Sequence, residues 1–130
     1  RYSLREIADV FIKNPDVKWL ATSCCHTKNG VNITNHRNPQ YTHNILFGNN
    51  QIGSPSVIAI RNFQDLPRMD LDFNWLMDCD YYQSMFIKYG EPEVLDEITV
   101  VNRTWGNRLT DTISQQIKDE EFVLVKKKYA

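Results

Sequence analysis

The sequence predicts a single α/β domain, in which a small mixed sheet is flanked by helices. Segments with a helical spacing of apolar residues alternate with short apolar runs, in the order helix, strand, long loop, strand, helix, strand, helix. The length of 130 residues is that of one ordinary domain. A hydrophobic fraction of 42% and a charged fraction of 24% are typical of folded globular proteins and argue against a disordered or fibrous chain.

The first predicted elements are a helix and a buried strand. Ser3 and Glu6 have the spacing of a capping box, with Ser3 as the N-cap of a helix. The helix should end near Asn14, because Pro15 disfavours a helical conformation at the residue before it. The apolar run 17–25 then predicts a strand.

The middle of the chain combines loops with short apolar segments. Residues 26–44 are polar and predict a long loop, with a small hairpin at the Asn-Gly turn signal of residues 29–30. A short helix is predicted over 41–47 and a tight turn over 53–56. The run 57–60 is the most apolar in the chain and predicts a buried strand.

The last part of the chain predicts a helix, a strand and a second helix. The first helix should cover about 75–89, because Gly90 and then Pro92 are typical of a helix end. Residues 93–103 have the composition of a strand. The last helix is predicted from about residue 112 into the lysine-rich tail, where positive charges favour a helix C-terminus.

The charge balance and the missing motifs exclude several function classes. Lys and Arg total 15 and Asp and Glu total 16, so a nucleic acid or an anionic membrane is not expected as the main partner. No apolar run approaches the length of about 20 residues that spans a bilayer, and no signal peptide is evident, so we expect a cytoplasmic protein. The P-loop and the Gly-x-Ser-x-Gly motif are both absent.

Three cysteines are an odd number, which does not suit a disulfide framework and fits a reducing compartment. Cys24 and Cys25 are neighbours in a predicted strand, where they point to opposite faces and chelate a metal poorly. We therefore expect buried cysteines, Cys79 included. The three histidines, at positions 26, 36 and 43, share no spacing and are expected at the surface.

Two Asp-x-Asp triplets supply the candidate carboxylates. Asp70 and Asp72 lie in a predicted loop, where a solvated surface is the ordinary interpretation. Asp78 and Asp80 lie at the start of a predicted helix, whose dipole favours a charged carboxylate. Such a carboxylate can accept a proton as a general base, and helix capping is the alternative. A third candidate is the turn of residues 53–56, whose N–H and hydroxyl groups can hold an anion or a sugar hydroxyl unless it is a plain turn.

The order of these motifs resembles the C-terminal half of family 2 glycosyltransferases, which have the GT-A fold. In that family a Gly-x-Pro-Ser segment leads into a strand that ends in Arg, a loop with an Asp follows, and an acidic pair opens a helix and supplies the catalytic base. The resemblance covers nearly the whole chain, and its main segments are 52–61, Asp70-Leu71-Asp72-Phe73, 75–82, Tyr89-Gly90 and 98–101.

This resemblance implies an inverting transfer of a sugar from a nucleotide-sugar donor to a hydroxyl of a glycan or lipid-linked acceptor, in polysaccharide or glycan biosynthesis. Asp78 is implied as the catalytic base, with Asp80 as the alternative base or an acceptor-orienting group. Arg103 and Arg108 are implied as diphosphate ligands. The implied acceptor side consists of Gly53, Ser54, Pro55, Ser56, Arg61, Trp75, Tyr82 and Trp105, although the aromatic residues fit a core equally well.

The nucleotide-binding half of that family, which carries the donor site and the metal-binding Asp-x-Asp, has no counterpart in the chain. We therefore expect about 90 to 110 further residues encoded upstream, the size of one half-domain. Mg or Mn is expected in the intact enzyme, with ligands mostly in that half, and this chain offers no certain ligand. Met77 stands where an acidic residue often precedes the base, and Asn107 stands where many relatives have His.

A half-domain should also expose an apolar sheet edge or form oligomers that cover it, and peripheral membrane association remains open. Two other hypotheses remain. The chain could be a stand-alone α/β module that binds carbohydrate or protein without catalysis. A metal-dependent hydrolase that uses Asp78 and Asp80 is weaker, because it needs further ligands that the sequence does not provide at convergent spacing.

Overall fold

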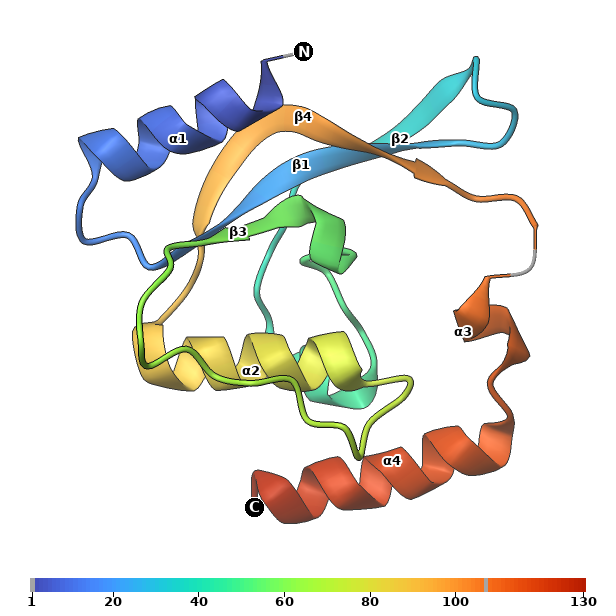
Figure 1. The fold of residues 1–130 in the computed structure, drawn as a ribbon. Coiled ribbons are helices and arrows are strands. Elements are labelled where there is room, and N and C mark those ends of the chain that lie inside the picture. Colours follow the sequence, from blue (N-terminus) through green and yellow to red (C-terminus); the bar gives the residue numbers. More distant parts are fainter. Residues whose placement is uncertain (1, 107) are drawn as a thin grey trace.

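The computed structural model describes residues 2–106 and 108–130. It is a mixed α/β structure in which helices flank a small sheet, as predicted (Figure 1). Its helices are α1 (Ser3–Lys13), α2 (Met77–Tyr89), α3 (Leu109–Thr112) and α4 (Gln115–Lys128), with short 3-10 helices η1 (His43–Phe47) and η2 (Pro55–Val57), and its strands are β1 (Trp19–Thr27), β2 (Ile33–Arg37), β3 (Ile58–Ile60) and β4 (Glu93–Arg103).

Strand β1 is the centre of the sheet. On one edge it pairs with β4 in parallel, from the pair of Leu20 and Glu93 to the pair of Thr27 and Arg103. On its other edge it pairs antiparallel with β3 near its start and with β2 near its end. Two antiparallel pairings and one parallel pairing make the sheet mixed.

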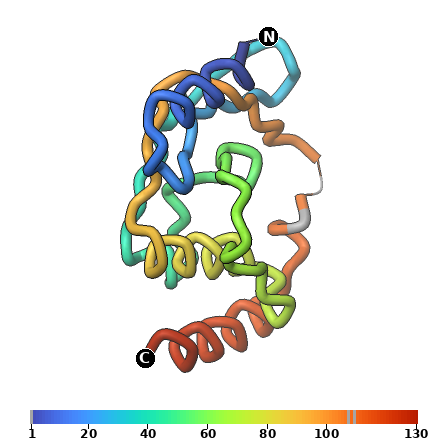
Figure 2. Tube along the Cα trace, turned by 60° about the vertical axis from the view of Figure 1, so that its left-hand side comes forward, coloured from blue at the N-terminus to red at the C-terminus, as the bar shows by residue number. Residues whose placement is uncertain are grey.

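The elements are stacked in layers. In Figure 1, α1 lies beyond the sheet at the top, α2 lies below the sheet, and α4 lies below α2. Figure 2 shows the same order from a second direction, with the segment that contains α3 running down one side from the sheet to α4. This segment and the sheet therefore enclose the start of α2 from two sides.

The core lies between the sheet and α2. Trp19 is buried at the start of β1, and its indole N–H donates to the carbonyl of Gly90 at the end of α2 over 3.0 Å. The ring of Tyr82, fully buried on α2, lies 6.2 Å from the Trp19 ring. Cys24, Cys25 and Cys79 are free and buried, as predicted.

A second set of polar contacts joins α2 to α4. Asp80 is 1% exposed, and one of its oxygens lies 2.8 Å from the Lys128 ammonium. The Tyr129 hydroxyl donates to the same oxygen over 2.8 Å. From the middle of α4, the buried carboxylate of Glu121 accepts the backbone N–H groups of Asn74, Trp75 and Leu76, just before α2 begins.

Helix α1 is amphipathic but has no buried residue. Arg61 at the end of β3 is its main polar attachment, since its guanidinium donates to the carbonyl of Phe11 over 2.7 Å and lies over the Phe11 ring. Within the described residues β4 pairs only with β1, and Ile98 and Val101 on it are about half exposed. Within the described residues one edge of β4 therefore has no strand partner, whereas β1 is paired along both of its edges.

Several local predictions need correction. The capping box is wrong, because Ser3 is already helical and the N-cap is Tyr2, without a side-chain cap. The polar region after β1 contains the predicted hairpin, but its second strand β2 makes it more than a loop. The last helix begins about three residues later than predicted, because Ser114 accepts the N–H of Ile117 and caps α4, and the short helix α3 before it was not predicted. Strand β3 is only half-buried.

Candidate functional site

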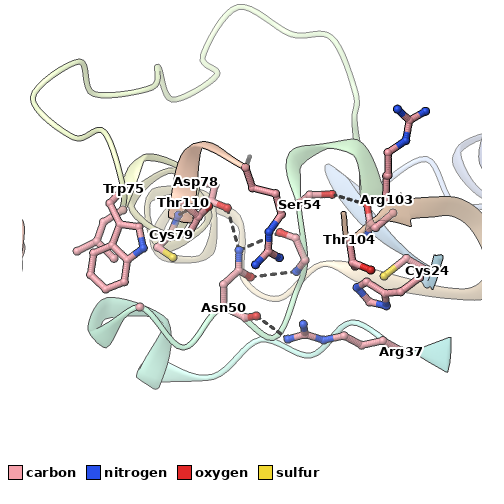
Figure 3. Close-up of a pocket in the computed structure, with 16 residues that line it drawn as sticks. Cys24, Arg37, Asn50, Ser54, Trp75, Asp78, Cys79, Arg103, Thr104 and Thr110 are labelled. Carbon is pink, nitrogen blue, oxygen red and sulfur yellow. Dashed lines mark hydrogen bonds between the residues drawn. The ribbon is translucent and has the colours of Figure 1, made fainter. Parts of the chain in front are cut away.

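A cavity of about 410 Å³ lies where the ends of β1 and β4 face the start of α2 (Figure 3). Its other walls are the loop between η1 and β3 and the segment of α3. Such a volume lies within the range of about 300–1,000 Å³ that is common for small-molecule sites. The lining residues are mainly polar: Cys24, His26, Arg37, Gly48, Asn50, Gly53, Ser54, Trp75, Leu76, Asp78, Cys79, Asn102, Arg103, Thr104, Arg108 and Thr110.

Asp78 is the one acidic residue among the described lining residues. It lies in the first turn of α2, and its Oδ1 accepts the N–H of Cys79 over 2.9 Å. Its Oδ2 accepts the side-chain amide of Asn50 over 3.0 Å. Burial raises the pKa of Asp78, and these two hydrogen bonds offset only part of that effect. The carboxyl is thus poised to take up a proton more readily than an exposed aspartate.

The raised pKa of Asp78 predicts a pH effect on stability. A folded-state pKa above the unfolded value of about 3.9 stabilises the fold fully below that value, and the contribution is lost as pH rises. Asp78→Asn cannot ionise, so the free energy of unfolding of the native protein, relative to this variant, should fall between pH 3 and pH 7. Urea unfolding of both proteins at several pH values measures this difference in the free energy of unfolding. If the native protein became more stable relative to Asp78→Asn as pH rises, the burial effect would be contradicted.

Asn50 organises this side of the cavity, and the sequence patterns did not indicate it. Its Oδ1 accepts the N–H groups of Ile52 and Gly53, each over 3.0 Å, while its amide donates to the Gly53 carbonyl and to Asp78. One side chain therefore fixes both the turn at Gly53 and the carboxylate. An asparagine shortly before a glycine turn is the signal that could have indicated this role, because Asn bonds readily to the backbone ahead of it.

Trp75 forms a wall of the cavity next to Gly48. Gly48 has a φ of +78°, and a Cβ added there would lie 2.7 Å from Cη2 of Trp75. Glycine is therefore required both by the backbone conformation and by the close approach of the indole ring.

Gly48→Ala should lower the free energy of unfolding by about 1–3 kcal/mol through backbone strain and should also displace the indole ring. The matched control is Gly106→Ala, because Gly106 has a φ of +85° but no atom within 4 Å of an added Cβ. Thermal unfolding and tryptophan fluorescence together separate the two effects. Equal changes in fluorescence for both variants would show that the contact with Trp75 is unimportant.

The cations of the cavity come from three separate segments. Arg37 ends β2, Arg103 ends β4, and Arg108 precedes α3. Arg108 pairs with Asp111 over 2.8 Å, whereas the Arg103 guanidinium lies 4.6 Å from the centre of the Trp105 ring. The two diphosphate ligands implied by the resemblance thus lie in the same cavity as Asp78.

The structure divides the remaining candidate residues. Gly53, Ser54 and Trp75 line the cavity, and the Ser54 hydroxyl lies 3.4 Å from the side-chain oxygen of Asn102. Pro55 and Ser56 form η2 outside the lining and are exposed.

Four further candidates do not reach the cavity. Asp80 is engaged by Lys128 and Tyr129 between α2 and α4, and Arg61 holds α1. Tyr82 is in the core, where its hydroxyl donates to the Gly53 carbonyl over 3.2 Å. Trp105 lies outside the lining under Arg103 and is 43% exposed.

The histidines and cysteines of the cavity are the remaining candidates for metal binding. The described residues do not bring three or more His, Cys, Asp or Glu side chains together as a metal site. Cys24 lines the cavity, but burial raises the pKa of its thiol, which therefore stays protonated. His26 is half-exposed and also lines the cavity. Asn107, expected to replace a histidine, lies outside the described residues.

Comparisons with protein-family models, with curated proteins and with solved structures found no match to this chain. The site is therefore interpreted from its own geometry. Among residues 2–106 and 108–130, no helix has the length and apolar character needed to cross a membrane.

Proposed function

We propose that this chain is the acceptor-binding half of an inverting glycosyltransferase with a GT-A-like fold, and that Asp78 is its catalytic base. The observation that carries the proposal is the position of Asp78. Its carboxylate lines a cavity of about 410 Å³, is oriented by Asn50, and shares that cavity with Arg103 at the end of β4 and Arg108 just before α3. An acid beside a cationic cavity suits a reaction in which a hydroxyl loses a proton and an anion leaves.

The proposed step is a single displacement. The acceptor hydroxyl oxygen forms a bond to the anomeric carbon while its proton passes to a carboxylate oxygen of Asp78. The bond between the anomeric carbon and the phosphate oxygen breaks, and the electron pair leaves with the nucleoside diphosphate. Attack opposite to the leaving group inverts the anomeric configuration. The raised pKa of Asp78 brings its proton affinity closer to working pH than that of an exposed aspartate.

Arg103 and Arg108 are the proposed ligands of the leaving diphosphate. Arginine suits this role because its planar guanidinium donates two parallel hydrogen bonds to phosphate oxygens. Arg103 is held on one face by Trp105, and Arg108 is held by Asp111. Both side chains are therefore oriented. Asp111 accepts from Nε and Nη2 of Arg108 over 2.9 and 2.8 Å, so the remaining N–H groups of Arg108 are the ones left for a phosphate.

A divalent metal such as Mg or Mn would stabilise the leaving charge when bound. The described residues bring together no group of three or more His, Cys, Asp or Glu side chains. In this proposal the ligands of the metal lie mostly in the nucleotide-binding half.

The test begins with the reading frame upstream of Arg1, which should encode about 90–110 residues with a buried strand followed by Asp-x-Asp. The complete gene product is then assayed with Mn²⁺ and a panel of nucleotide sugars for acceptor-dependent release of nucleoside diphosphate. Release that requires both substrates supports the proposal. An upstream frame without such a half-domain would overturn it, and glycan binding by the chain without donor or metal would favour a binding module.

A further inference from the structure

Arg37 is a cation of the cavity that the proposed transfer step does not use. It lies at the end of β2, where the hairpin returns it to the position opposite Cys24 on β1. One guanidinium nitrogen, Nη2, donates to the backbone carbonyl of Asn50 over 2.5 Å. This bond fixes the group while leaving other N–H donors free for a ligand.

The charge of Arg37 is not neutralised by the described part of the protein. The ion pairs found there involve His36, Lys88, Arg108 and Lys128, and none involves Arg37. Asp78 is the one described acid in the lining, and Asn50 stands between it and Arg37. A half-buried guanidinium without a carboxylate partner in a cavity is suited to bind an anion.

The position of Arg37 indicates which substrate carries that anion. Asn50 contacts both groups, with its backbone oxygen on Arg37 and its side chain on Asp78, as Figure 3 shows. If Asp78 is the base, the group next to it is the acceptor, because the base must touch the acceptor hydroxyl. Arg103 and Arg108 come from other segments, which remain available for the donor.

We propose that the acceptor is an acidic sugar, and that Arg37 binds its carboxylate or phosphate while Asp78 takes the proton of its hydroxyl. This inference rests on the proposed function, because it takes Asp78 as the base. A carboxylate and a phosphate ester share the same planar pairs of acceptor oxygens, which the guanidinium binds through two parallel hydrogen bonds. A neutral sugar would leave the Arg37 charge uncompensated in the cavity.

The test measures binding of three probes to the complete gene product: methyl glucoside, methyl glucuronide and glucose 6-phosphate. Shifts of backbone amide NMR signals at Asn50 and Cys79 report the site. One of the acidic probes should bind at least about tenfold more tightly than methyl glucoside, as expected for charge-assisted hydrogen bonds. Which acidic probe binds better separates a uronate from a phosphate.

Arg37→Gln should remove this preference, and Arg37→Lys should restore only part of it, because lysine keeps the charge but not the paired donors. The control is Arg68→Gln, since Arg68 is exposed in a loop outside the cavity and its loss should leave the preference unchanged. Equal affinity for methyl glucoside and both acidic probes, or an unchanged preference in Arg37→Gln with unchanged β2 signals, would overturn the inference. An acidic preference without any sugar transfer would instead refute the proposed function alone.

Discussion

Replacing Asp78 with asparagine should lower the rate of sugar transfer by about 10²–10⁴-fold, which is the usual contribution of a general base. Asparagine keeps the shape and the carbonyl that accepts a hydrogen bond, but it cannot take up the proton of the acceptor. Burial penalises the charged carboxylate, so at neutral pH the free energy of unfolding of the variant should be at least that of the native protein. The measurement is kcat for nucleoside diphosphate release by the complete gene product, at saturating donor and acceptor.

Asp80→Asn is the comparison for this prediction. Its carboxylate contacts Lys128 and Tyr129 and not the cavity, so its loss should lower the melting temperature and leave kcat nearly unchanged well below that temperature. Turnover close to that of the native protein in Asp78→Asn, with loss of turnover in Asp80→Asn, would move the role of base to Asp80. Loss in both variants with intact folding would show that neither position can be assigned from geometry alone.

Helix geometry alone predicts that the side chains of Asp78 and Asp80 lie on different sides of α2. Residues two apart on a helix point in directions about 200° apart, so Asp78 and Asp80 cannot both face one cavity. The sequence motif presents them as a pair, whereas the helix separates them. One lies towards the sheet and the turn at Gly53, and the other towards α4. The helix, its end at Gly90 and Pro92, and the separation of the two carboxylates were thus predictable from the sequence, whereas which of the two faces the cavity depends on the tertiary structure.

The elements that local sequence determines were predicted well. Helix α2 and strand β4 lie within about two residues of their predicted ranges, because glycine and proline mark the boundary between them. Strand β1 was predicted two residues early, and the hairpin after it was predicted from its Asn-Gly turn. The last helix was predicted about three residues early, because a capping serine inside a polar helical pattern is a weak signal.

The site residues that were not predicted, or were placed wrongly, depend on contacts between segments distant in the sequence. Arg37 and Asn50 belong to polar segments whose composition does not indicate a site. Arg37 enters the site because the hairpin returns along β1, and Asn50 enters it from the loop after η1, where its backbone carbonyl accepts from Arg37. Arg61 was assigned to the acceptor side from the order of motifs, yet its guanidinium is used by the carbonyls of Phe11 and Val17. The hydrogen-bond acceptors that an arginine contacts depend on tertiary packing, which the sequence of one segment does not determine.

Glu121 is a second residue whose role depends on packing between distant segments. It is 2% exposed, and its two oxygens accept the backbone N–H groups of Asn74, Trp75 and Leu76 over 2.7–3.0 Å. These N–H groups precede the first turn of α2, where they would otherwise lack helical partners. A carboxylate also favours the positive end of the helix dipole. One side chain of α4 thus completes the start of the helix that carries Asp78.

Glu121→Ala should lower the free energy of unfolding by about 3–4 kcal/mol, because three buried donors lose a charged acceptor. Glu121→Gln should lower the free energy of unfolding by less than Glu121→Ala, because the amide oxygen still accepts a hydrogen bond. Some loss remains, because the NH₂ group faces N–H donors and cannot accept from them. The matched control is Glu120→Ala, since Glu120 is exposed and bonds only to Gln116 through its side chain, so a change within about 0.5 kcal/mol is expected. Urea unfolding measures all three. Equal losses at positions 120 and 121 would show that the effect comes from α4 as a helix and not from its contact with α2, and the start of α2 would then hold Asp78 without help from α4.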